Sequence, residues 1–201
     1  MKSLTTRKRL LSTLGLLLAG PALASQTPPM IDFFDTGVTQ CWERTYDTAH
    51  LKEHPRQLVT AISFTYFPTV PFMTDEQGEL LPYWFNDGQY SAFNPMVRVR
   101  FRDSGHEFEN MAICTSAPAE DLKPGQIHCG IECDGGSFTI EVEPDGNLIL
   151  RNRGFAVTPC GEPAPGEEDV RLVRPEDDQK VFRLYPMEAD ACRLPEMPEE
   201  G

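Results

Sequence analysis

The segment Val97 to Cys114, VRVRFRDSGHEFENMAIC, decides the fold class of this chain. Apolar and polar residues alternate on both sides of an Asp-Ser-Gly turn, the pattern of two half-buried antiparallel strands joined as a hairpin. A two-residue turn at Ser104-Gly105 fixes the expected register. The expected pairs are Arg102 with Glu107, Phe101 with Phe108, and Arg100 with Glu109.

The same period of two recurs in three further segments, which are Leu58 to Phe67, Phe138 to Leu150 and Val170 to Tyr185. A turn at Asp145-Gly146 sets Ile140 and Val142 against Leu148 and Leu150. A third hairpin is expected to close through Pro175 to Gln179, between VRLVR and KVFRLY.

One short helix is predicted, from Thr48 to Glu53, because Asp47 is a favourable N-cap and Pro55 stops a helix. The remaining pattern predicts an all-β domain of six to nine strands. We expect a small antiparallel barrel or sandwich with one short helix, stapled by disulfides.

The N-terminus has the three parts of a secretory signal peptide. A basic stretch precedes the apolar run Leu10 to Ala19, and Ala22-Leu23-Ala24 forms a cleavage site before Ser25. The apolar run is shorter than the roughly 20 residues that span a bilayer as a helix. We therefore expect a signal peptide over 1–24, Sec-type export to the periplasm or medium, and no membrane attachment after cleavage.

The charge of the chain is strongly acidic, with 18 Lys and Arg against 31 Asp and Glu. Cleavage removes four basic residues and no acidic one, so the net charge of the mature chain falls from −13 to near −17. Nucleic acid is therefore not an expected partner, because phosphate contacts need a basic face. A cationic protein is compatible with this balance.

Six cysteines follow the signal peptide, and an oxidising compartment favours disulfides among them. Fifteen pairings are possible. The arrangement of the expected strands favours Cys114 with Cys129, Cys133 with Cys160, and Cys41 with Cys192. The alternative is a zinc site at Cys129, Cys133 and His128, but the second half of a usual zinc motif is missing.

Two groups of side chains are candidates for binding. His50 and His54 lie four apart on one face of the expected helix and could reach one metal ion, although a structural role is favoured. Arg98, Arg100 and Arg102 share one strand face and could hold an anionic ligand, although pairing with Glu107 and Glu109 is favoured.

An aromatic-rich excursion, residues 68–95, interrupts the strands. Its aromatic residues Tyr83, Trp84, Phe85 and Tyr90 could cover a ligand or plug one end of a barrel, and we favour the plug slightly. The domain then spans 41–192, between a linker at 25–40 and an acidic mobile tail at 193–201.

Three segments carry a resemblance to known proteins: YDTAHLKEHPRQLVTAISF (Tyr46 to Phe64), CGIECDGGSF (Cys129 to Phe138) and DDQKVFRLYP (Asp177 to Pro186). With its HLxxHPxQ and CGxECDGG segments, the chain resembles uncharacterised exported bacterial proteins of about this size. The resemblance implies export and disulfides, and no particular activity. In general shape the chain also looks like small periplasmic β-barrels that inhibit lysozyme, an analogy of fold alone.

The sequence contains no nucleophile elbow or phosphate loop. We expect a monomeric binding or interaction module without a cofactor, for a small ligand or a cationic protein. The alternative function is metal binding or hydrolysis by His50, His54 and nearby carboxylates.

The signal peptide predicts the start of the exported chain. Expression in a bacterial host followed by intact-mass analysis of the exported protein should give a chain that begins at Ser25. Recovery of the uncleaved chain would contradict this prediction.

Overall fold

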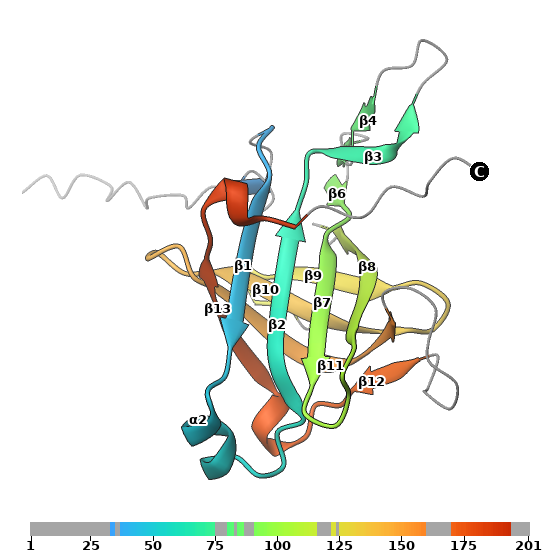
Figure 1. Cartoon of the computed structure of the whole chain (residues 1–201). Helices are drawn as coiled ribbons and strands as arrows, with labels where there is room; N and C mark the ends of the chain where they lie inside the picture. The colour runs from blue at the N-terminus through green and yellow to red at the C-terminus, as the bar shows by residue number, and fades with distance from the viewer. Residues whose placement is uncertain are drawn as a thin grey trace, which may run out of the picture.

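Eight antiparallel strands form a closed barrel (Figure 1). The computed structural model describes residues 33–34, 37–74, 80–82, 84–86, 91–115, 122–123, 125–159 and 170–193. The barrel strands are β1 (Gln40–Thr45), β2 (Val59–Tyr66), β7 (Met96–Phe101), β8 (Glu107–Thr115), β9 (Ile127–Ile131), β10 (Gly136–Val142), β11 (Leu148–Pro159) and β13 (Val181–Pro186). The remaining elements are α2 (Thr48–Glu53), β3 (Thr69–Thr74), β4 (Leu80–Pro82), β5 (Trp84–Asn86), β6 (Ser91–Phe93), β12 (Arg171–Val173) and the 3₁₀ turns η1 (Asp177–Gln179) and η2 (Ala189–Ala191).

The barrel has an up-and-down topology. Each barrel strand pairs with the next barrel strand along the chain, and β13 pairs with β1 to close the ring. Closure leaves no open edge among these eight strands. The all-β prediction is confirmed, and of its two architectures the structure has the barrel.

The β7–β8 hairpin forms, but its predicted register is wrong by two residues. Arg100 pairs with Glu107, and Arg98 pairs with Glu109. The loop is longer than two residues because the Ser104 Oγ accepts a hydrogen bond from the backbone N–H of His106 at 3.1 Å. Because side chains alternate between the two faces of a strand, a register shift of two residues leaves every side chain on its predicted face.

The β10–β11 hairpin has the predicted register, with Ile140 opposite Leu150 and Val142 opposite Leu148. The third predicted hairpin is wrong. β12 and β13 both pair with β11 and not with each other, so they form one interrupted strand with η1 in the interruption.

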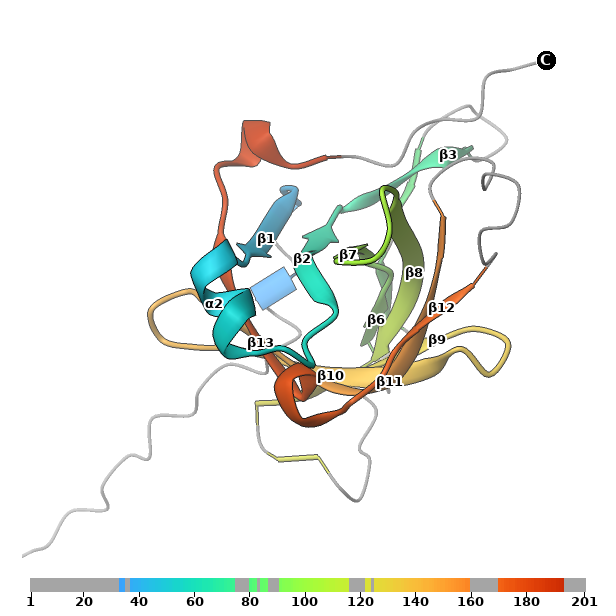
Figure 2. The same ribbon diagram turned by 60° about the horizontal axis from the view of Figure 1, so that its bottom comes forward.

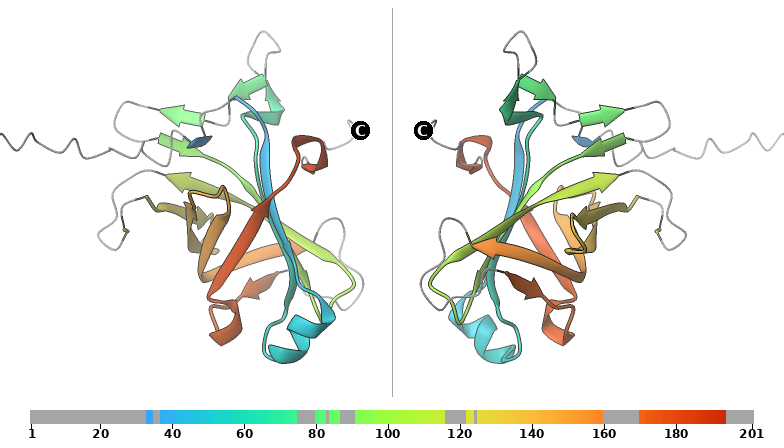
Figure 3. Two further views of the ribbon diagram at one scale, coloured as in Figure 1. Left: turned by 90° about the vertical axis from the view of Figure 1, so that its left-hand side faces the viewer. Right: turned by 90° about the vertical axis from the view of Figure 1, so that its right-hand side faces the viewer.

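The helix prediction is confirmed at both ends. α2 runs from Thr48 to Glu53, and the Asp47 side chain accepts a hydrogen bond from the backbone N–H of His50 at 2.8 Å. α2 and η1 lie at one end of the barrel, and the strands of the excursion lie at the other (Figure 3).

Apolar side chains from all eight strands fill the barrel interior. They include Trp42, Phe64, Val97, Ala112, Ile127, Ile140, Leu150 and Phe182, all of which are buried. Phe34, in the segment predicted as a linker, is also fully buried and stacks on Phe93 with ring centroids 4.5 Å apart. The core therefore begins before the first strand.

The excursion contains strands that the sequence did not predict. β3 pairs with β4, and β5 pairs with β6. On its other side, β6 pairs with the barrel strand β8. Phe93 is buried beside Phe34 and Tyr66, so this end of the excursion contributes to the core. Within the described residues, no helix is long and apolar enough to cross a membrane.

Two of the three expected disulfides are present, Cys41–Cys192 and Cys114–Cys129. The third is not made, because Cys133 is an exposed free thiol, while Cys160 lies outside the described residues. Cys133 lies in the turn between β9 and β10, and Gly135 of this turn accepts a hydrogen bond from Ala156.

Phe34 provides a test of the core. Phe34→Ala should lower the free energy of unfolding by roughly 3 to 5 kcal/mol, because it leaves a cavity among packed rings. Phe33→Ala is the matched control, since Phe33 is 40% exposed and should cost far less. Urea unfolding of both variants measures the difference, and equal losses would contradict the position of Phe34 in the core.

Candidate functional site

A cavity of about 280 Å³ is lined by residues of α2 and of the segment around η1. These two elements lie at the same end of the barrel, which is turned forward in Figure 2. We call it the helical-end cavity. Its lining consists of Tyr46, His50, His54, Gln57, Asp178, Lys180 and Val181. Residues far apart in the sequence meet here because β13 pairs with β1.

Aromatic rings and one guanidinium group form a row along this end. The centroids of Tyr46 and His50 are 4.6 Å apart, and those of His50 and His54 are 4.3 Å apart, with near-parallel rings. The spacing of four residues places these rings on one face of the helical segment. The Arg44 guanidinium lies 5.1 Å from the Tyr46 centroid and 5.0 Å from that of Tyr185. We call these five residues the ring row.

Hydrogen bonds fix the orientation of His50. The Gln57 Nε2 donates to the Val59 carbonyl at 2.8 Å, so the Gln57 Oε1 faces His50. The His50 Nε2 lies 3.1 Å from this oxygen and therefore carries the donated proton. The second nitrogen, Nδ1, is left as an acceptor in the neutral ring.

A carboxylate lies at the open end of the ring row. The Asp178 Oδ1 is 3.5 Å from the His54 Nδ1, and the two side chains are 20% and 41% exposed. Asp178 and His54 can bind a hydrogen-bond donor or a cationic group of another molecule, because each side chain is partly exposed to solvent.

Tyr46 supplies a hydroxyl that stays protonated. Burial raises the pKa of Tyr46 to about 12, the nearby Arg44 charge lowers it in part, and Tyr185 raises it further. The phenol is consequently neutral throughout the physiological range.

A buried glutamine holds Asp178 in place. The Gln179 side chain is 3% exposed, and its Oε1 accepts hydrogen bonds from the backbone N–H groups of Leu58 and Val59 at 2.8 and 2.9 Å. Its backbone carbonyl accepts from the Asn152 side chain at 2.9 Å. η1 is thereby attached to β2 and β11. Nothing in the sequence distinguished Gln179 or Gln57 from exposed polar residues.

The arginines Arg98 and Arg100 of β7, and Arg102 just beyond it, do not converge on one ligand. Arg98 binds Glu109 at 2.7 Å, and Arg100 binds Glu107 at 3.3 Å. Arg102 donates to the Leu51 carbonyl of α2 at 2.9 Å. The expected role in cross-strand pairing therefore holds for Arg98 and Arg100, with the shifted register.

The two metal hypotheses have different outcomes. The zinc alternative is wrong, because Cys129 is bonded to Cys114. His50 and His54 are indeed adjacent, but among the described residues no group of three His, Cys, Asp or Glu could hold an ion.

Of the four aromatic candidates in the excursion, the structure describes the backbone of two. Trp84 and Phe85 lie on β5, opposite Phe93 and Ala92 of β6. Tyr83 and Tyr90 lie outside the described residues.

The architecture places the chain in the class of up-and-down β-barrels with a packed interior and a surface cavity at one end, lined by aromatic and polar residues. Comparison with protein-family models, curated proteins and solved structures finds no match.

The raised pKa of Tyr46 predicts a loss of stability at alkaline pH. Between about pH 10 and pH 12 the unfolded chain loses the phenol proton while the folded chain keeps it, so stability falls as the pH rises. The free energy of unfolding should fall between about pH 9 and pH 11 by roughly 1 kcal/mol more in the wild type than in Tyr46→Phe. Urea unfolding at both pH values tests this, and identical losses would contradict it.

Proposed function

We propose that this protein is an exported binding module that captures a basic partner protein on its outer surface. One partner side chain would enter the helical-end cavity, and the ring row would form the surrounding contact. The observation that carries the proposal is this cavity, where the Asp178 carboxylate meets Tyr46, His50 and His54 of the ring row outside a filled barrel.

Because the interior of the barrel is packed, we place the binding site on its surface. Barrels that enclose a ligand need an internal cavity, whereas buried aromatic and aliphatic side chains occupy this interior among the described residues. Binding at the helical end requires no change in the core.

The size and composition of the site favour a protein partner. A volume of about 280 Å³ lies below the usual range for small-molecule pockets, and it suits one inserted side chain. Tyrosine and arginine are enriched among residues that dominate protein interfaces, and Tyr185 is 43% exposed.

Charge favours a basic partner. The full chain carries a net charge of −13, and the exported chain would carry about −17. This charge accelerates encounter with a cationic protein and disfavours an acidic one. Asp178 would pair with the inserted cationic group beside the imidazole of His54. The export signal and the observed disulfides are compatible with a partner outside the cytoplasm. No structural observation specifically favours metal binding or hydrolysis over this function.

Removal of the Asp178 charge tests the proposal. Asp178→Asn keeps the shape of the side chain and should weaken the binding of a basic probe protein such as lysozyme about tenfold, or ~1.4 kcal/mol. Asp134→Asn is the matched control, because Asp134 is an exposed carboxylate outside the cavity lining. Calorimetry at low ionic strength measures both affinities.

An equal loss in the two variants would show that only net charge matters and would contradict a role for the cavity. Absence of binding to any basic protein in a panel of unrelated sequences would contradict the proposed function.

A further inference from the structure

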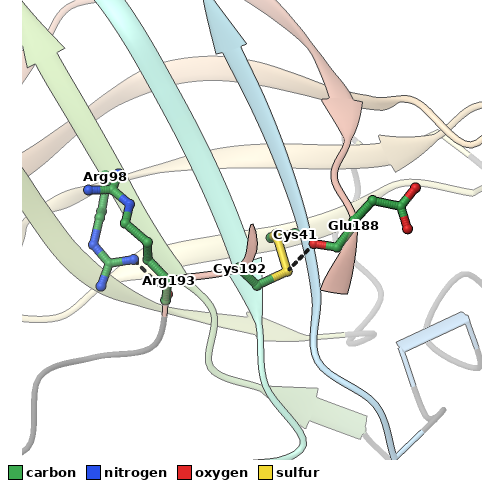
Figure 4. The surroundings of a disulfide bond; sticks show 5 residues. All are labelled: Cys41, Arg98, Glu188, Cys192 and Arg193. Carbon is green, nitrogen blue, oxygen red and sulfur yellow. Dashed lines mark hydrogen bonds between the residues drawn. A yellow bond between two sulfur atoms is a disulfide. The ribbon is translucent and has the colours of Figure 1, made fainter. Parts of the chain in front are cut away.

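The C-terminal residues 187–193 cross the outside of the barrel, and we call this segment the strap. It turns through η2 and returns over β1 and β2 towards β7 (Figure 1). The Met187 N–H donates to the Cys41 carbonyl at 2.9 Å at its start, and Cys192 is bonded to Cys41. At its end, the Arg98 guanidinium donates to the Arg193 carbonyl at 2.8 Å (Figure 4).

The strap covers polar side chains on the outer faces of β1, β2 and β7. Arg98 faces outward, yet it is only 6% exposed because the strap lies over it. Glu43, Ser63 and Thr65 line the narrow space between the strap and the barrel, which has room for about 10 Å³. No ligand fits there while the strap is in place.

The two disulfides differ in their access to solvent. Cys114 and Cys129 are both fully buried, between strands that pair directly through these two residues. Cys192 is partly exposed, although its partner Cys41 is 6% exposed. The Cys41–Cys192 bridge is therefore the more accessible of the two to a dissolved thiol, whereas the other cannot be reached without opening the barrel.

We propose that the Cys41–Cys192 disulfide is a reducible latch, and that a dithiol reductant or dithiol oxidoreductase opens it to release the strap. A thiolate of the reductant attacks the Sγ of Cys192, the S–S bond breaks, and Cys41 leaves as a thiolate that takes up a proton. The second thiol of the reductant then displaces Cys192. Two electrons and two protons pass to the protein, and the dithiol becomes a disulfide.

The other attachments of the strap are noncovalent. The Arg193 guanidinium binds Glu107 through two contacts, the Arg193 carbonyl accepts a hydrogen bond from Arg98, and the Met187 N–H donates to the Cys41 carbonyl. Release follows because reduction removes the one covalent link that keeps these groups together. The open strap uncovers Arg98, Ser63 and Thr65 and leaves Glu107 without its Arg193 partner. The latch lies on the outer wall, away from the helical-end cavity, so it does not depend on the proposed basic partner.

Thiol trapping tests the order of reduction. The full mature chain with Cys133→Ser and Cys160→Ser, which removes other thiols, would be titrated with dithiothreitol under native conditions and alkylated. Mass spectrometry of peptides should find Cys41 and Cys192 modified at a dithiothreitol concentration at least tenfold below that needed for Cys114 and Cys129. Simultaneous modification of both pairs would overturn the proposal.

Hydrogen exchange tests the release of the strap. In the reduced protein, exchange at the Met187 N–H and across the strap should accelerate at least tenfold, while the Leu51 N–H of α2, bonded to Asp47, keeps its rate. Cys192→Ser should reproduce the open strap without reductant, and Arg193→Ala, which keeps the bridge, is the matched control. Unchanged protection of the strap after reduction would refute the latch, and so would equal opening in Arg193→Ala.

Discussion

The barrel depends on the short seam at which β13 meets β1. Only two residue pairs define its register, Trp42 with Pro186 and Glu43 with Tyr185. A covalent bond reinforces it, because Cys41 on β1 is joined to Cys192 beyond β13. The opposite seam, between β8 and β9, carries the second disulfide. The barrel thus consists of two consecutive four-stranded meanders, and a disulfide lies at each of the two seams where consecutive meanders close the ring. The end of β11 also pairs with β8, without a bridge.

The helical-end cavity is a product of the same seam. Pairing of β13 with β1 brings Tyr185 within 2.6 Å of the Arg44 guanidinium, which in turn lies over Tyr46. The chain then enters α2, whose two histidines extend the row of stacked rings. η1, fixed by the buried Gln179, brings Asp178 to its end. A site built this way cannot form before the ring closes.

Alternation of apolar and polar residues predicted β2, β7, β8, β10, β13 and the first part of β11, but not β1 or β9, which lie outside the alternating segments. Turn chemistry at Asp145-Gly146 was sufficient for one register. The β7–β8 register was wrong because a side-chain hydrogen bond from the loop to Ser104 decided its length. Phe34 and Gln179 were missed because their burial depends on contacts with distant strands. His50 and His54 were recognised as neighbours, but Asp178, more than 120 residues later, could be placed beside them only by the closed barrel.

The bridge between Cys41 and Cys192 also determines how the protein responds to mechanical force. These residues enclose every strand of the barrel except the first residue of β1, and 151 positions separate them along the chain. Tension applied to the chain outside this pair passes through one covalent bond, so the hydrogen bonds between the strands carry no load. Once that bond is broken, the same tension peels β1 and β13 apart at their two-residue junction. The oxidation state therefore sets whether the barrel resists or yields to pulling.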